Sequence, residues 1–227
     1  VMSENKTIKI NYKQFNSTLR PERFAYISSS LACIPFEGLD FCGKSTQVKL
    51  LSDFLEKKNK KVNLIREPGG TLISEKIREI LLDKKNSGMF EDCELLLFAS
   101  ARAQLVREII LPKLKNNEYV ISDRFHDSSF AYQGFGRGIP VQFINDLMKF
   151  VISEAVPDIT FFIDIPLEVI SERKKNIAGL ELDRIENTHG ILTTNGTTST
   201  TFIPHKIRVY SLSQGAEQVT LEEKSTV

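Results

Sequence analysis

A glycine-rich segment at residues 38–45 offers the most specific chemistry in the chain. Its sequence, GLDFCGKS, matches the phosphate-binding pattern G-x-x-x-x-G-K-[ST] between a short apolar run and an amphipathic stretch. In this pattern the glycines let backbone N–H groups approach phosphate oxygens, Lys44 supplies a cation, and Ser45 offers its hydroxyl to Mg²⁺. The N-terminus of the following helix adds partial positive charge. The segment therefore predicts a nucleotide-binding loop.

Two further polar sites follow apolar runs of strand length. Glu67 lies in a turn at residues 66–71 that is rich in Pro and Gly, and Asp123 and Arg124 end the run 119–121. Ligands of open α/β sheets bind at the carboxyl ends of the strands. Glu67 is therefore a candidate contact for substrate or hydrated metal, Asp123 for Mg²⁺ or its water, and Arg124 for a forked contact to phosphate. The alternatives are a purely structural turn and a surface ion pair.

These sites need an α/β framework, and the remaining pattern predicts one. Short apolar runs expected to be strands cover residues 31–36, 62–65, 119–122 and 159–164. Amphipathic stretches expected to be helices cover residues 44–58, 72–82, 92–115, 141–155 and 167–175. This alternation is typical of a parallel sheet with helices on both faces. The sequence thus predicts a three-layer α/β domain with both phosphate sites at the carboxyl edge.

Pro35 lies in the run that should form the strand before the loop. That strand is expected to be central, and proline has no backbone N–H to donate to a neighbour. Two interpretations stay open. Either the strand tolerates one missing hydrogen bond beside its end, or this run is not the native lead-in to the loop.

Composition excludes several classes of protein. The 227 residues carry 30 Lys and Arg against 29 Asp and Glu, a net charge of +1, so the broad positive surface of a nucleic-acid-binding or lipid-binding protein is not expected. Three cysteines without C-x-x-C spacing suggest neither a disulfide framework nor a zinc site. No apolar stretch is long enough for a membrane-spanning helix. A cytoplasmic protein with no membrane partner is expected.

Taken together, the motifs make the chain similar to the bacterial thymidylate kinase family. They are FEGLD at 36–40, KSTQ at 44–47, REPGGT at 66–71, ELLLF at 94–98, RAQ at 102–104, DR at 123–124, AYQG at 131–134, PDIT at 157–160 and DRIE at 183–186. The resemblance covers about residues 36–186. It implies a P-loop nucleoside monophosphate kinase fold that transfers phosphoryl from ATP to dTMP with Mg²⁺, for dTTP synthesis, and a homodimer.

The resemblance also implies roles for individual residues. The residues expected to bind ATP are Gly38, Leu39, Asp40, Phe41, Cys42, Gly43, Lys44, Ser45 and Thr46. Those expected to bind the acceptor nucleotide are Glu67, Arg78, Phe98, Arg102, Arg124, Ser129 and Gln133. Phe98 would stack on thymine, with Arg102 one helical turn later reaching the base from the same face. Taken without the motif, Phe98 in an apolar helical run would be a core aromatic. Ser45 and Asp123 are the expected metal contacts.

Phosphoryl transfer also needs cations around the equatorial oxygens. The family places an arginine in the loop or in a mobile lid, and the interior of this loop offers none. Arg173 and Arg184 of the expected lid are therefore preferred over Lys174 and Lys175. The alternative is a solvated basic helix end. The expected catalytic residues are then Lys44, Arg124, Arg173, Arg184 and Asp40.

The two ends of the chain depart from the family pattern. Residues 1–30 form an unassigned extension, residues 31–186 the expected core with a lid at about 173–186, and residues 187–227 an atypical segment whose first part is rich in Thr. The Thr-rich composition is typical of a loop or a disordered segment. Two alternatives to a working dTMP kinase stay open: a nucleotide-binding remnant with impaired catalysis, and a kinase for another nucleoside monophosphate.

Overall fold

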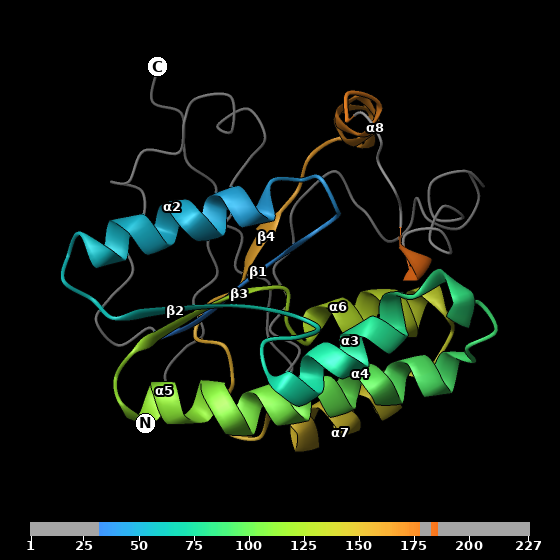
Figure 1. Ribbon diagram of the computed structural model, residues 1–227, viewed down its shortest axis with the longest axis horizontal. Coiled ribbons are helices and arrows are strands. Elements are labelled where there is room, and N and C mark those ends of the chain that lie inside the picture. The colour runs from blue at the N-terminus through green and yellow to red at the C-terminus, as the bar shows by residue number, and fades with distance from the viewer. Residues whose placement is uncertain (1–31, 178–182, 186–227) are drawn as a thin grey trace.

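The computed structural model describes residues 32–177 and 183–185. A parallel sheet of four strands, ordered β2-β3-β1-β4, forms the middle layer (Figure 1). The strands are β1 (Cys33–Gly38), β2 (Val62–Arg66), β3 (Tyr119–Asp123) and β4 (Phe161–Ile163). Helix α2 (Lys44–Glu56) covers one face of the sheet, while α4 (Glu91–Leu105), α5 (Leu111–Lys115) and α7 (Val141–Ile152) lie on the other. The predicted three-layer α/β fold is confirmed.

The remaining helical elements match the prediction only in part, since the short segments at residues 84–86, 127–129 and 130–136 were not predicted. They are α3 (Leu72–Leu82), α6 (Asp127–Ser129), α8 (Leu167–Lys175), the short 3-10 turn η2 (Lys84–Asn86) and the π-helical segments η3 (Val106–Ile110) and η4 (Phe130–Gly136). The single helix predicted over 92–115 is wrong in detail, because η3 separates α4 from α5. The helix predicted to reach residue 155 ends at Ile152, where Ser153 adopts a left-handed backbone with φ 51°.

Strand β3 shows how the sheet separates two cores. Tyr119 and Ile121 pack with α2 residues on one face, whereas Val120 between them packs with residues of α4 and α7 on the other. Successive side chains of a strand point to opposite faces, so a strand buried on both faces needs an uninterrupted apolar run. This explains the uninterrupted apolar run from Tyr119 to Ile121 in β3.

Pro35 sits in the central strand without breaking a ladder. Successive residues of a parallel strand direct their backbone groups to opposite neighbours. The Phe36 carbonyl accepts from Arg124 on the β3 side, and the Cys33 carbonyl accepts from Asp158 on the β4 side. Pro35 therefore faces the β4 side, but β4 begins only at Phe161, opposite Phe36. The missing donor falls before the ladder starts, which confirms the first of the two interpretations.

Several predicted features lie outside the described residues. These are the extension at 1–30, the segment at 187–227, and residues 178–182 and 186 of the expected lid. Within the described ranges, none of the helices combines the length and apolar character needed to cross a membrane.

Candidate active site

The predicted phosphate-binding loop connects β1 to α2. Its glycines meet steric demands that a side chain would violate, since a Cβ on Gly38 would lie 2.6 Å from the Ile163 carbonyl oxygen. Gly43, the residue before α2, has φ 102°, a conformation that residues with a Cβ rarely adopt. The Lys44 amine donates to the carbonyls of Gly38 (3.0 Å) and Leu39 (2.8 Å), so it is held over the loop. Burial lowers the pKa of this amine.

Oxygen atoms suited to Mg²⁺ meet where the loop faces β3. The Ser45 hydroxyl at the start of α2 donates to the Asp123 carboxylate at the end of β3, with 2.6 Å between the oxygens. In the part of the chain that the structure describes, no group of three or more His, Cys, Asp and Glu side chains could hold a metal. Two oxygen ligands fit Mg²⁺, which usually keeps water and phosphate oxygens in its coordination shell.

Asp40 and Arg124 form an ion pair between the loop and the β3 end. The Arg124 guanidinium lies 2.6 Å from Oδ1 of Asp40, and its other terminal nitrogen donates to the Ser128 hydroxyl at 3.2 Å. Burial opposes ionisation of Asp40, but Arg124 and Lys44 hold the pKa of its carboxyl below the usual value. Arg124 itself has φ 70°, so the backbone turns sharply as it leaves β3. The side chain is thereby aimed back at the loop.

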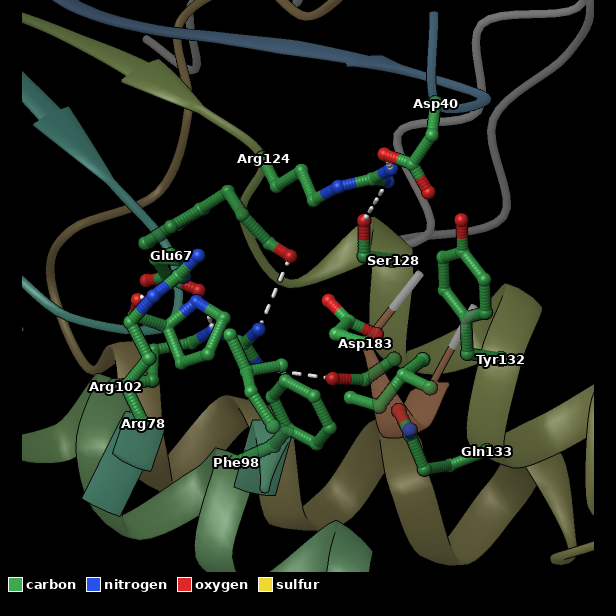
Figure 2. Close-up of a pocket in the computed structure, with 15 residues that line it drawn as sticks. Asp40, Glu67, Arg78, Phe98, Arg102, Arg124, Ser128, Tyr132, Gln133 and Asp183 are labelled. Carbon is green, nitrogen blue, oxygen red and sulfur yellow. Dashed lines mark hydrogen bonds and ion pairs between the residues drawn. The ribbon is translucent and has the colours of Figure 1, made fainter. Parts of the chain in front are cut away.

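A pocket of about 210 Å³ opens beside this ion pair (Figure 2). All seven residues predicted to bind an acceptor nucleotide line it, together with Asp40: Glu67, Arg78, Phe98, Arg102, Arg124, Ser129 and Gln133. They come from the β2–α3 turn, α3, α4, the β3–α6 turn, α6 and η4. The pocket thus joins the acceptor candidates to the loop through Asp40 and Arg124.

Arg102 is the centre of a buried polar network in the wall of this pocket. Its Nε donates to Glu67 at 2.5 Å, and its terminal nitrogens donate to the Ser129 hydroxyl at 2.9 Å and the Phe125 carbonyl at 3.1 Å. Burial raises the pKa of Glu67 to about 7 against the opposing pull of Arg102. The Glu67–Pro68 peptide bond is cis. Arg78 donates to the Pro68 carbonyl at 2.7 Å, so it also ties α3 to this turn.

Gln133 lines the pocket and is held in place by Glu94. The Gln133 amide donates to Glu94 at 2.9 Å, and Arg137 pairs with the same carboxylate at 3.1 Å. Phe98, which is half-buried on α4, lines the pocket one turn after Glu94. A flat aromatic ring opposite amide and guanidinium groups can hold a planar base by stacking and hydrogen bonds.

The two lid arginines occupy different places. Arg173 on α8 donates to the Phe41 carbonyl of the phosphate-binding loop at 2.8 Å. Arg184 is buried, pairs with Glu94 at 2.8 Å and donates to the Leu81 carbonyl at 2.7 Å. Arg173 is therefore beside the loop, whereas Arg184 is held by α3 and α4.

Some pocket residues were not predicted. Tyr132 precedes Gln133 and lies under the Arg124 guanidinium, 5.4 Å from ring centre to Cζ, and Asp183 of the expected lid also lines the pocket (Figure 2). Both residues belong to family motifs, AYQG at 131–134 and DRIE at 183–186, and this membership could have identified them. Glu37 was also missed: its buried carboxylate accepts from the N–H of Phe125 at 2.8 Å and from the Ser128 hydroxyl at 2.7 Å.

A phosphate-binding loop, a polar pocket beside it and a parallel sheet together define a P-loop kinase. A sequence model described as thymidylate kinase matches residues 36–194. The chain belongs to the thymidylate kinase family.

Individual relatives agree with this assignment. A thymidylate kinase of Thermosipho africanus is 53% identical over 153 residues, which cover 67% of this chain and 74% of that protein. A thymidylate kinase of Kosmotoga olearia is 47% identical over 153 residues, covering 67% and 72%. Among solved structures, a thymidylate kinase from Ehrlichia chaffeensis superposes with a TM-score of 0.55 at 39% identity, over 71% of this chain and 84% of that one.

Proposed function

We propose that the protein transfers the γ-phosphoryl group of ATP to dTMP, which yields ADP and dTDP for dTTP synthesis. The observation that carries this proposal is that one pocket gathers the seven acceptor candidates beside the phosphate-binding loop. Membership of the thymidylate kinase family specifies dTMP as the acceptor and ATP as the donor. In the reaction, a phosphate oxygen of dTMP bonds to the γ phosphorus, and the bond from that phosphorus to the β–γ bridging oxygen breaks.

The roles proposed for the residues follow from their positions. Phe98 stacks on the thymine ring, and Gln133 and Arg102 with Ser129 give the polar contacts around the base. Arg78 and Glu67 lie where the acceptor phosphate and hydrated metal would enter. Arg124 neutralises charge between the acceptor and transferred phosphoryl groups, and Asp40 orients it through their 2.6 Å ion pair. Such transfers depend mainly on positioning and electrostatics.

The donor side is proposed to consist of the loop and the lid. Residues 38–46 hold ATP, with Lys44 beside the β and γ phosphates. Ser45 and Asp123 hold Mg²⁺, which when bound neutralises phosphate charge. Arg173 supplies the lid cation, because it already contacts the loop at the Phe41 carbonyl. Arg184 is proposed to contribute from the acceptor side of the lid, where it pairs with Glu94.

The decisive experiment is a coupled assay of ADP release from the full chain with ATP and Mg²⁺, comparing dTMP with dUMP, dCMP and dGMP. We expect a clear preference for dTMP, and Lys44→Met, which removes the loop cation, should abolish turnover. Equal rates with the other monophosphates would indicate a different kinase. Absence of ADP release from a folded chain that still binds dTMP would instead identify an impaired remnant.

The metal site has its own test. Asp123→Asn keeps the size of the side chain but removes the charge next to Ser45. The Mg²⁺ concentration for half-maximal activity should rise at least about tenfold, whereas Asp92→Asn on exposed α4 surface should leave it unchanged. An unchanged requirement in Asp123→Asn would remove this residue from the site.

We also propose a cytoplasmic homodimer. Exposed apolar side chains on α3 support this assembly, because Leu72, Ile73 and Ile80 are 76%, 51% and 47% exposed and a second copy would cover them. Light scattering should give twice the chain mass of 25.7 kDa. A monomeric mass at assay concentration would contradict the dimer.

Residues 31–186 are proposed to be the kinase unit, with the lid at about 173–186 and residues 1–30 and 187–227 outside it. Limited proteolysis of the full chain should leave a stable fragment close to these bounds. A full-length chain that resists the protease at both ends would contradict this division.

A further inference from the structure

Phe41 has an unusual backbone for its residue type. It lies in the middle of the phosphate-binding loop with φ 66°, in the left-handed region that residues with a side chain seldom occupy. Such conformations persist where surrounding contacts hold them, and they gather at functional sites. Its ring is partly buried against the core cluster that contains Phe36 and Val48. Contacts with the rest of the protein are therefore expected to hold Phe41 in this conformation.

Two successive cations of α8 contact this one residue. The Arg173 guanidinium donates to the Phe41 carbonyl at 2.8 Å, and the Lys174 amine lies 5.2 Å from the centre of the Phe41 ring. Both side chains are half-buried, whereas Glu172 and Lys175 on either side of them are exposed. The distance from Lys174 to the ring is within the range of a cation–π interaction. The turn of α8 that carries Arg173 is thus fixed to the loop at Phe41.

The opposite end of α8 is held differently. Ile170 is 6% exposed and belongs to the core cluster on the α2 face of the sheet, and Val169 packs against the same cluster. Lys174 is also among the cations that lower the pKa of Asp40, after Arg124 and Lys44, so its charge acts on the carboxyl of the loop. Apolar contacts therefore seat the start of α8, and Phe41 seats its basic end.

We propose that Phe41 is a positioning residue that docks α8 onto the phosphate-binding loop, and so sets where Arg173 and Lys174 stand relative to the phosphates. The backbone carbonyl of Phe41 orients Arg173, and its ring holds Lys174. The catalytic consequence rests on the proposed phosphoryl transfer. The docking itself does not, so it can be tested without substrate.

The first test is limited trypsin digestion of the full chain without nucleotide, with cleavage after Arg173, Lys174 and Lys175 followed by mass spectrometry. Phe41→Leu should speed cleavage there by about twofold to fivefold, the change expected for loss of one partly exposed cation–π pair. Phe41→Tyr retains an aromatic face and should cleave at the wild-type rate. Phe54→Leu is the matched control, since Phe54 of α2 packs against the same core cluster and the Lys58 amine lies 5.2 Å from its ring centre. Its cleavage rate at α8 should be unchanged.

A second set of variants separates docking from general loosening. In Lys174→Met the sites after Arg173 and Lys175 remain, and adding Phe41→Leu should accelerate their cleavage no further. The proposal would be overturned if Phe41→Leu were cleaved at α8 at the wild-type rate, or if Phe54→Leu accelerated this cleavage as much. It would also be overturned if the accelerations of Lys174→Met and Phe41→Leu multiplied in the double variant.

The kinetic consequence distinguishes positioning from a structural role. Phe41→Leu should raise the KM for ATP or lower kcat by about threefold while leaving the KM for dTMP unchanged, and Phe41→Tyr should restore both. Equal increases in both KM values would contradict positioning of the donor side. If the wild-type chain does not phosphorylate dTMP, the proposed function fails, while the digestion experiment still decides the docking.

Discussion

Arg102 and Glu67 meet at 2.5 Å inside the pocket wall, where their side chains are 2% and 3% exposed. Two opposite charges from α4 and the β2–α3 turn therefore neutralise each other out of contact with water. Removing one partner of a buried pair leaves the other without compensation, which costs far more than losing both.

Arg102→Met should lower the free energy of unfolding by about 3–5 kcal/mol, because the Glu67 carboxylate stays buried alone. Adding Glu67→Gln should recover part of this loss. Urea denaturation of both single variants and the double variant provides the measurement. A double variant that loses the sum of the two single effects would show that the charges are not coupled.

Phe98→Ala should raise the KM for dTMP by about tenfold or more, since stacking of a base on an aromatic side chain contributes about 1–3 kcal/mol. The KM for ATP should hardly change. Phe90→Ala is the matched control, because Phe90 precedes the same helix and is 75% exposed. If instead Phe98→Ala mainly destabilises the fold with dTMP affinity preserved, Phe98 is a packing residue.

Arg173→Ala should lower kcat at least about tenfold with little change in the KM for dTMP, because we propose that its charge acts on the transferred phosphoryl group. Glu172→Ala, at the preceding exposed position of α8, serves as the control. Steady-state kinetics with each nucleotide varied in turn gives both constants. Unchanged turnover in Arg173→Ala would exclude it from the transfer step.

His126 predicts a pH dependence of stability. Burial and the nearby charge of Arg102 lower its pKa to about 4, from an ordinary 6.5, despite the opposing influence of Glu37; the Asp127 carboxylate lies 3.5 Å away. Between these values the unfolded chain binds a proton that the folded chain does not. The contribution of His126 to stability is therefore present above pH 6.5 and is lost as the pH falls toward 4, by at most about 1.4 kcal/mol per pH unit.

The measurement compares urea denaturation of the wild type and His126→Gln across this window. The difference between the two proteins isolates His126, because the raised pKa values of Glu67 and Asp127 act with the opposite sign in both. We expect the stability of the wild type to fall more steeply with acidification. Parallel curves would show that His126 does not titrate differently on folding.

The sequence was sufficient for the parts of the fold that depend on local pattern. The spacing of apolar residues and the motifs located β1, α2 and the loop. They also placed Phe98 and Arg102, four residues apart, on one helix. They could not locate η3, because the same apolar spacing suits an α-helix and a π-helical segment. They also left Pro35 unresolved, since its tolerance depends on where β4 begins.

The pocket shows the same limit. Five of its seven predicted members lie in the family motifs: Glu67, Phe98, Arg102, Arg124 and Gln133. Tyr132 belongs to the same motif as Gln133, but its contact with Arg124 depends on how the π-helical segment η4 packs against the end of β3. Glu37 was hidden for another reason. Its role depends on contacts about ninety positions along the chain, at Phe125 and Ser128, and no local pattern contains such a pairing.

Glu37 helps to fix the position of the phosphate-binding loop relative to the turn after β3. Glu37 lies on β1 immediately before the loop. Its carboxylate accepts hydrogen bonds from Phe125 and Ser128 in the segment that follows β3. Phe36 is in register with Asp123 across these strands. A slip of one residue would turn Glu37 to the opposite face and release that turn. The spacing between the phosphate-binding loop and the turn after β3 is thus set by the register of β1 and β3.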